Sequence, residues 1–194
     1  GARRFIIGLG GSATSDSGTG MLRALDNKWR DIAAHCLFTL ASDVTNPLCG
    51  PNGAAHVFAP QKGATPAMVQ QLDDRARRFA EASNRALHRD CSNTPGAGAA
   101  GGLGYAFMQY LGATVQSGAD LLLTLTRFDD LLPNTLLIIT GEGHSDRQTL
   151  MGKLPSRILA HALSHNIPVW LLSGAITDAP SLLAAGFSRL LPIT

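Results

Sequence analysis

Residues 136–153 have the sequence LLIITGEGHSDRQTLMGK. The apolar run Leu136–Ile139 predicts a β-strand, and the glycine-rich segment behind it predicts a flexible loop at the rim of an α/β sheet, where ligands usually bind. This segment carries Glu142, Asp146 and Lys153. Carboxylates can hold magnesium or take a proton, and a lysine can neutralise a phosphoryl group. The stretch therefore predicts phosphate chemistry, although its glycine spacing and the leucine after Lys153 do not match a Walker A motif.

Short apolar, β-favouring runs recur along the chain, with helical patterns between them. The other runs are Phe5–Ile7, Leu37–Leu40, Val169–Leu172 and Leu190–Ile193. This alternation predicts an α/β fold with a largely parallel sheet flanked by helices. No linker composition interrupts the chain, so we expect residues 1–194 to form one α/β region.

The clearest helix begins after Thr65, a good N-cap, with Pro66 preset for the first helical position. Further helices are expected from near Ala99, over residues 155–165 and over residues 181–185. The charged face of the first helix predicts a solvated surface. Its residues are Asp73, Asp74, Arg75, Arg78 and Glu81.

Composition excludes several classes of protein. The chain has 194 residues, 45% of them hydrophobic and 15% charged, which predicts a globular fold with a sizeable core. A net charge of +2, spread along the chain, gives no basic stripe for nucleic acid, and no apolar run approaches the roughly 20 residues of a membrane span. The three cysteines and six histidines lack metal-ligand spacing, which argues against zinc and favours a reducing compartment, the cytoplasm.

Two further loops follow predicted strands. After Phe5–Ile7, the glycines Gly10 and Gly11 would let backbone N–H groups approach an anion, and Ser12 adds a hydroxyl; the alternative is a tight turn before a capped helix. After Leu37–Leu40, Asp43 and Asn46 would lie at the carboxyl end of a strand and could meet the first loop. Asp43 could bind magnesium or act as a general base, or it could form an Asx turn before a proline.

Lys62 and a second glycine-rich stretch leave similar alternatives open. Lys62 is an isolated cation ahead of the long helix, suited either to phosphate or simply to solvent. Residues 96–102, GAGAAGG, could place orphan N–H groups near an anion, or could allow close packing at a helix start.

Together these segments resemble the bacterial type I glycerate kinases, which use ATP and magnesium to phosphorylate D-glycerate. Five blocks carry the resemblance across nearly all of the chain. They are residues 7–14 with Asp16, Gly18 and Gly20-Met21; residues 43–48 with Gly50 and Gly53; Phe58 with residues 60–64; residues 95–104; and residues 140–143 with Asp146, Gln148, Gly152-Lys153 and Pro155. The resemblance implies a two-domain α/β fold whose members extend further at both ends. It also places His144 where the family commonly has an arginine, for which Arg147 could substitute.

The resulting hypothesis is phosphorylation of glycerate, with 2-phosphoglycerate as the product commonly made by the bacterial relatives. Residue roles follow from it. The catalytic residues would be Asp43, Asp146 and Lys153; the substrate or phosphate ligands Gly10, Gly11, Ser12, Asn46, Lys62, Gly141 and Glu142; and the metal ligands Asp43, Glu142 and Asp146. Glycerate and ATP are the expected partners, without nucleic acid or membrane, and a homo-oligomer is left open. The alternatives are a non-catalytic module that binds an organic acid or nucleotide, and an inactive part of a longer kinase.

Overall fold

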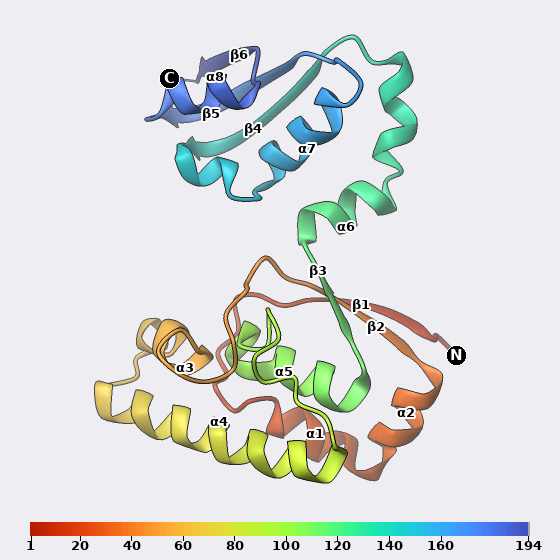
Figure 1. Ribbon diagram of the computed structural model, residues 1–194, viewed down its shortest axis with the longest axis vertical. Coiled ribbons are helices and arrows are strands. Elements are labelled where there is room, and N and C mark those ends of the chain that lie inside the picture. The colour runs from red at the N-terminus through yellow and green to blue at the C-terminus, as the bar shows by residue number, and fades with distance from the viewer. Residues whose placement is uncertain (194) are drawn as a thin grey trace. The chain divides into compact units, whose positions relative to one another are not determined.

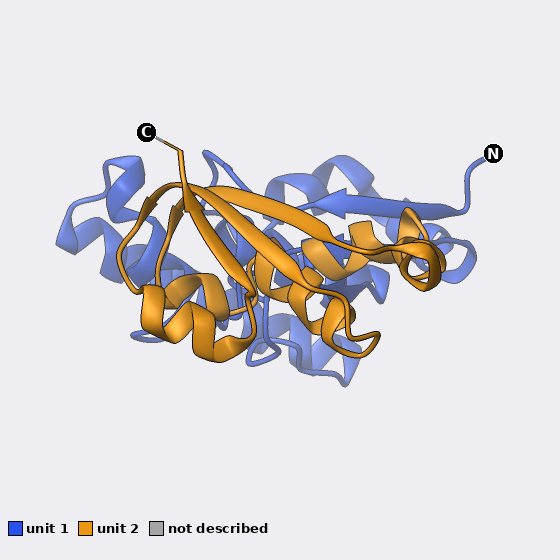
Figure 2. Cartoon of the chain, turned by 90° about the horizontal axis from the view of Figure 1, so that it is seen from above, with its two compact units in different colours: residues 1–118 blue, residues 119–194 orange. Residues whose placement is uncertain are grey.

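The chain forms two compact units in a computed structural model that describes residues 1–193. Unit 1 comprises residues 1–118 and unit 2 residues 119–194 (Figure 2). The boundary coincides with the start of helix α6 (Gly118–Leu125), so it has none of the composition of a linker. This explains why the sequence suggests a single region where the structure has two units.

Unit 1 contains a three-stranded parallel sheet in the order β1-β2-β3, formed by Arg4–Gly8, Leu37–Ala41 and Thr114–Gln116. The first two strands confirm the apolar runs predicted there, whereas β3 is too short and too polar to stand out in the sequence. Helices α1, α4 and α5 lie on one side of this sheet (Figure 1). The helices of unit 1 are α1 (Thr19–Leu25), α2 (Trp29–His35), α3 (Ala54–Phe58), α4 (Pro66–Leu87) and α5 (Ala99–Leu111), with short 3₁₀ turns at Asp26–Lys28 and Pro60–Lys62.

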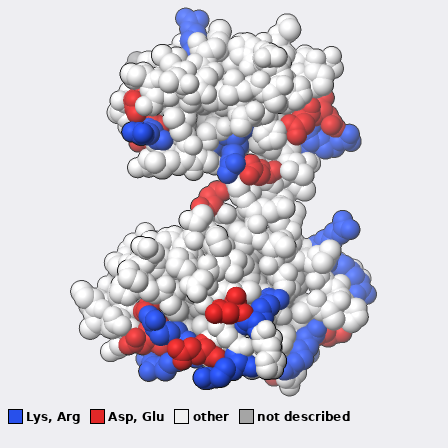
Figure 3. All heavy atoms as spheres, viewed as in Figure 1, with Lys and Arg blue, Asp and Glu red and all other residues white. Residues whose placement is uncertain are grey.

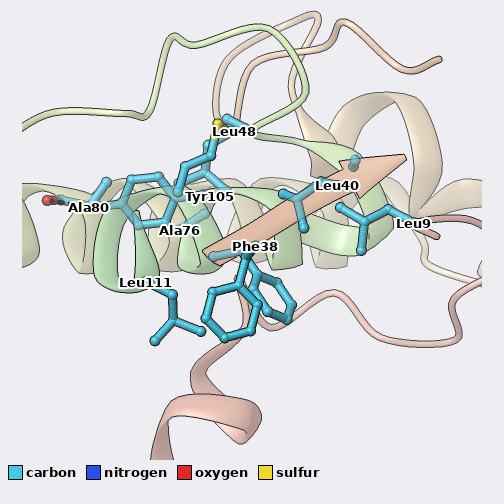
Figure 4. Packing of buried hydrophobic residues seen from close by; sticks show 12 residues of the cluster. Leu9, Phe38, Leu40, Leu48, Ala76, Ala80, Tyr105 and Leu111 are labelled. Atoms are coloured by element: carbon cyan, nitrogen blue, oxygen red, sulfur yellow. Dashed lines mark hydrogen bonds between the residues drawn. The ribbon is translucent and has the colours of Figure 1, made fainter. Parts of the chain in front are cut away.

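The core of unit 1 fills the space between the sheet and α5. Phe38 of β2 stacks on Phe5 of β1 and packs against Phe107 of α5, with ring centroids 5.1 and 5.8 Å apart. Leu40 and Tyr105 are fully buried in the same cluster (Figure 4). Burial of one strand face against a helix is the packing expected of an α/β unit, and it fixes where the loops after β1 and β2 emerge.

Helix α4 begins as the sequence predicts, because the Thr65 hydroxyl accepts a hydrogen bond from the Met68 N–H at 3.3 Å. Acidic and basic side chains lie close together over α4 (Figure 3). Asp73, however, is not part of a solvated face. It is 2% exposed and accepts hydrogen bonds from the Gly50 N–H at 2.8 Å and from Arg77 at 2.7 Å. Among the described helices, none has the length and apolar character needed to cross a bilayer.

Unit 2 has its own parallel sheet in the order β4-β5-β6, formed by Ile138–Ser145, Val169–Ile176 and Arg189–Pro192. Val169 and Leu171 pack into a core with side chains of α7 (Leu154–Leu163) and α8 (Ala179–Ala185). The other helical segments are α6 and the 3₁₀ turns Phe128–Asn134 and Arg147–Leu150. Both units thus confirm an α/β fold with parallel sheets flanked by helices, although the strands form two separate sheets.

Strand β4 differs from the predicted strand in where it begins and ends. It starts two residues later than the apolar run and continues through Gly141 to Ser145, where we predicted a flexible loop. A Cβ atom on Gly141 would lie 2.8 Å from the Leu172 carbonyl oxygen, and one on Gly174 would lie 2.7 Å from the Gly143 carbonyl oxygen. These glycines therefore permit close approach of β4 and β5, a use that glycine often has inside strands.

Candidate functional site

The predicted site residues fall in both units, and each group is described within its own unit. Unit 1 holds Gly10, Gly11, Ser12, Asp43, Asn46 and Lys62. Unit 2 holds Gly141, Glu142, Asp146 and Lys153.

In unit 1, a cavity of about 170 Å³ lies where the loop after β1 meets the turn that carries Lys62. Lys62 donates to the Ser12 hydroxyl at 3.1 Å and to the Thr14 carbonyl at 2.6 Å. The structure thus brings Gly10, Gly11, Ser12 and Lys62 together at one cavity. The lining residues are Leu9, Gly10, Gly11, Ser12, Val44, Phe58, Gln61, Lys62, Ala100 and Gly101.

Local sequence explains how Lys62 is held there. Pro60 sits in the first turn of the 3₁₀ segment Pro60–Lys62, and Gly63 ends that segment with a φ of 93°, in the left-handed region that favours glycine. Partial burial lowers the pKa of the Lys62 ammonium below its usual value. An ammonium has three donors, of which Ser12 and Thr14 take two, so one can face an anion in the cavity.

Asp43 and Asn46 lie beyond the carboxyl end of β2, as predicted, but neither lines this cavity. The Asp43 carboxylate accepts a hydrogen bond from the Gly118 N–H at 3.1 Å, and the Asn46 amide donates to the Asn52 carbonyl at 2.8 Å. Both contacts hold loops in place. From this segment it is Val44 that reaches the cavity.

The glycine-rich stretch at residues 96–102 packs closely against the first loop. The Gly101 carbonyl accepts a hydrogen bond from the Ser17 N–H at 3.0 Å, and a Cβ atom on Gly101 would collide with the Thr14 carbonyl. Residues 100–102 adopt positive φ values within α5. The close-packing alternative therefore accounts for these glycines, and the packing positions the loop that Lys62 contacts.

In unit 2, Glu142 is the centre of a small polar cluster near the end of β4. Its carboxylate accepts hydrogen bonds at Oε1 from the Ser145 hydroxyl at 3.1 Å and from the Thr149 hydroxyl at 2.5 Å. Its Oε2 atom lies 3.4 Å from the Lys153 ammonium. Glu142 is 16% exposed on its side chain and Lys153 is 44% exposed, so the pair reaches the surface through the lysine.

Asp146 caps the 3₁₀ turn Arg147–Leu150. Its Oδ1 atom accepts the Gln148 N–H at 2.7 Å, while its own N–H donates to the Thr149 hydroxyl at 3.1 Å, which completes a reciprocal capping box. The Oδ2 atom lies 3.8 Å from His144 Nε2. The capping interaction therefore occupies Oδ1 of Asp146, while Oδ2 faces His144.

The three predicted metal ligands are divided between the units, with Asp43 in unit 1 and Glu142 and Asp146 in unit 2. Within residues 1–193, no three His, Cys, Asp or Glu side chains come together in a way that could hold a metal ion. Asp43 belongs to unit 1, and both oxygens of Glu142 already face donors.

Sequence reasoning missed Thr149 and Ser145, both fully buried against Glu142. The Asp146-to-Thr149 spacing of three residues is the signal that could have found Thr149, because it matches a capping box. It missed Thr14 as well, since that residue contributes a backbone carbonyl, which has no signature in the sequence.

Comparison with known proteins gives consistent matches. A model described as the glycerate kinase family matches residues 1–37 and 26–194. Glycerate 2-kinase of Escherichia coli K12 is 39% identical over 204 residues, covering 92% of this chain and 54% of that protein. Glycerate kinase of Bacillus subtilis 168 is 40% identical over 220 residues, covering 100% and 58%.

A solved structure agrees with these matches. The crystal structure of the "putative glycerate kinase 2" of Salmonella typhimurium LT2 superposes with a TM-score of 0.82 at 34% identity, covering 98% of this chain and 56% of that one. The chain thus spans a little over half the length of these relatives.

Proposed function

Because the chain belongs to the glycerate kinase family, we propose that the protein transfers the γ-phosphoryl group of ATP to a hydroxyl of D-glycerate, giving 2-phosphoglycerate. Phosphoryl transfer depends mainly on positioning and charge neutralisation, for which loops at strand ends are well suited. The three cysteines are free thiols, which supports the cytoplasm as the location of this reaction.

The observation that carries the proposal is the contact of Lys62 with the glycine loop. An ammonium held by Ser12 and Thr14 at the wall of a small cavity offers a fixed positive charge beside the glycine-rich backbone that lines the same cavity. Such a site suits a carboxylate or a phosphate. In unit 1 the proposed substrate ligands are therefore Gly10, Gly11, Ser12 and Lys62, with Asn46 holding the neighbouring loop.

In unit 2 the proposed roles rest on the Glu142 cluster. Lys153 neutralises charge on the phosphoryl group, and Glu142 holds the lysine through its 3.4 Å contact. Asp146 is the candidate base, and Gly141 allows the close strand packing that sets Glu142 at its place in β4.

Magnesium fits this donor set only in part. The ion usually keeps several waters and takes one or two carboxylates together with phosphate oxygens, so a cluster of three protein ligands is not required. Asp43 is the candidate ligand in unit 1 and Asp146 the candidate ligand in unit 2, since each has one oxygen engaged by a backbone N–H and a second oxygen left over. Glu142 fits less well because its oxygens already accept hydrogen bonds or face Lys153. When bound, magnesium would neutralise charge on the phosphates.

A coupled assay of ADP release with D-glycerate, run beside calorimetric binding, tests the function. Glycerate-dependent ADP release is the expected result. Binding without turnover would instead support the non-catalytic module.

Two substitutions test the roles of the unit 2 residues. We expect Asp146→Asn and Lys153→Ala each to lower kcat by about 100-fold or more with the fold intact. Asparagine caps helices as well as aspartate does, so Asp146→Asn keeps the turn and changes only the charge. Asp178→Asn, which alters the cap of α8 in the same way, and Lys28→Ala are the matched controls. Wild-type turnover in either site variant would refute the assigned roles.

A further inference from the structure

One buried hydroxyl links the two acidic residues of unit 2. Thr149 is fully buried and its Oγ1 atom lies 2.5 Å from Glu142 Oε1 and 3.1 Å from the Asp146 nitrogen. A hydroxyl has one proton and can accept further hydrogen bonds. Because the Asp146 N–H can only donate, Thr149 accepts from it and gives its own proton to Glu142. The direction of both hydrogen bonds is therefore fixed.

The same geometry determines which Glu142 oxygen is available. Ser145 and Thr149 both donate to Oε1, and both are fully buried. Rotation of the carboxylate would break both hydrogen bonds. Oε2 is thereby held toward Lys153, at 3.4 Å. The orientation of the Lys153 side chain thus depends on the buried hydroxyls of Ser145 and Thr149.

We propose that Thr149 is a positioning residue, which sets Glu142 and the Asp146 turn in a single geometry and through Glu142 orients Lys153. This inference rests on the proposed kinase function of that site. Thr149 itself does not reach substrate, since its side chain is enclosed. It acts by joining the end of β4 to the cap of the 3₁₀ turn Arg147–Leu150.

The test in the full-length protein compares Thr149→Val, which removes the hydroxyl at nearly constant shape, with Thr149→Ser, which keeps it. We expect Thr149→Val to lower kcat by roughly 10- to 100-fold, because a small displacement of a reacting group has effects of this size, with KM changed by less than about threefold. Thr149→Ser should retain kcat within about threefold of wild type. Thr140→Val is the matched control, since Thr140 is a buried threonine in β4, the strand that carries Glu142, and makes no hydrogen bond to Glu142.

Two results would overturn the proposal: full kcat in Thr149→Val, or an equal loss in Thr149→Ser. Dependence on Glu142 is tested by adding Thr149→Val to Glu142→Ala, where it should lower kcat by less than about twofold further. If Thr149→Val does not fold, Thr149→Ala takes its place in every comparison.

A second measurement does not depend on activity. The thermal midpoints of Thr149→Val, Glu142→Ala and the double variant should be non-additive, because both single changes break the same hydrogen bond. Additive shifts would contradict the linkage. If the wild-type protein releases no ADP with glycerate, the proposed function fails, while this cycle still tests whether Thr149 and Glu142 are coupled.

Discussion

Replacing Lys62 tests the unit 1 site most directly, because this side chain has two separable contributions there. It bridges the Ser12 hydroxyl and the Thr14 carbonyl, and it supplies positive charge to the cavity. Lys62→Gln keeps a donor for the bridge and removes the charge. Lys62→Arg keeps the charge and changes the shape of the donor group.

The size of the effect follows from the contacts. Ser12 and Thr14 leave one ammonium donor for an anionic ligand, and a hydrogen bond to a charged group contributes about 2 kcal/mol, or roughly 30-fold in Kd. We therefore expect Lys62→Gln to raise the Kd for glycerate roughly 30-fold, and Lys62→Arg to raise it by less than about tenfold.

The pH dependence gives an independent check. Burial lowers the pKa of Lys62, so the ammonium loses its proton at a lower pH than an ordinary lysine does. Glycerate affinity should fall as the pH rises through that lowered pKa. Stability should change in the opposite direction: the unfolded chain keeps the ordinary, higher pKa and binds more protons in this window, so Lys62 makes the free energy of unfolding rise with pH. A loss of affinity caused by this lysine is thus distinct from unfolding.

Calorimetric titration with D-glycerate between neutral pH and pH 10 measures the affinity of wild type and of each variant. Circular dichroism is the control for folding. Arginine stays protonated in this range, so the alkaline loss of affinity should disappear in Lys62→Arg. Equal affinities of Lys62→Gln and wild type, or the same alkaline loss in Lys62→Arg, would refute the reasoning.

Two further predictions concern the framework of unit 1. In urea titrations, Asp73→Ala should lower the free energy of unfolding by about 3 kcal/mol, because it removes a buried acceptor and leaves the Gly50 N–H without its hydrogen-bond partner. Asp74→Ala on the same helix should change the free energy of unfolding by less than about 0.5 kcal/mol. Equal effects of the two substitutions would contradict this account. Iodoacetamide at pH 8 should label Cys49 last of the three cysteines, because burial, with a further contribution from Asp73, raises the pKa of its thiol to about 11. Peptide mass spectrometry measures the order of labelling, and a result in which Cys49 is labelled first would show this prediction to be wrong.

The sequence predicted elements whose signals are local. Thr65 and Pro66 mark the start of α4 because a capping hydroxyl and a fixed φ act within a few residues. Phe5–Ile7 and Leu37–Leu40 are β-strands, as their short apolar, β-favouring runs indicated, although only Phe38 and Leu40 among these residues are buried. In contrast, β3 (Thr114–Gln116) has only three residues and depends on pairing with β2, a partner more than 70 residues away.

The burial of Asp73 was missed because its charge was taken to indicate a solvated face. Helical spacing instead puts Asp73 on the same face as Val69, Ala76 and Ala80, all of which are buried. Its environment comes from the Gly50 N–H, which a distant loop brings to the helix. Similarly, Lys62 looks like an isolated cation in the sequence, and only the fold supplies Ser12 and Thr14 as its partners.

The local structure around Glu142 differs from the predicted one. We predicted a flexible loop there because glycines and polar residues follow an apolar run. In the structure, Gly141 and Gly174 serve the close packing of β4 and β5, where any Cβ would meet a carbonyl oxygen. A paired strand holds a side chain more rigidly than a loop does, and the Thr149 and Ser145 hydroxyls remove the remaining freedom of the carboxylate. The carboxylate that contacts Lys153 is therefore fixed in place, and our proposal that Lys153 neutralises charge on the phosphoryl group rests on this arrangement.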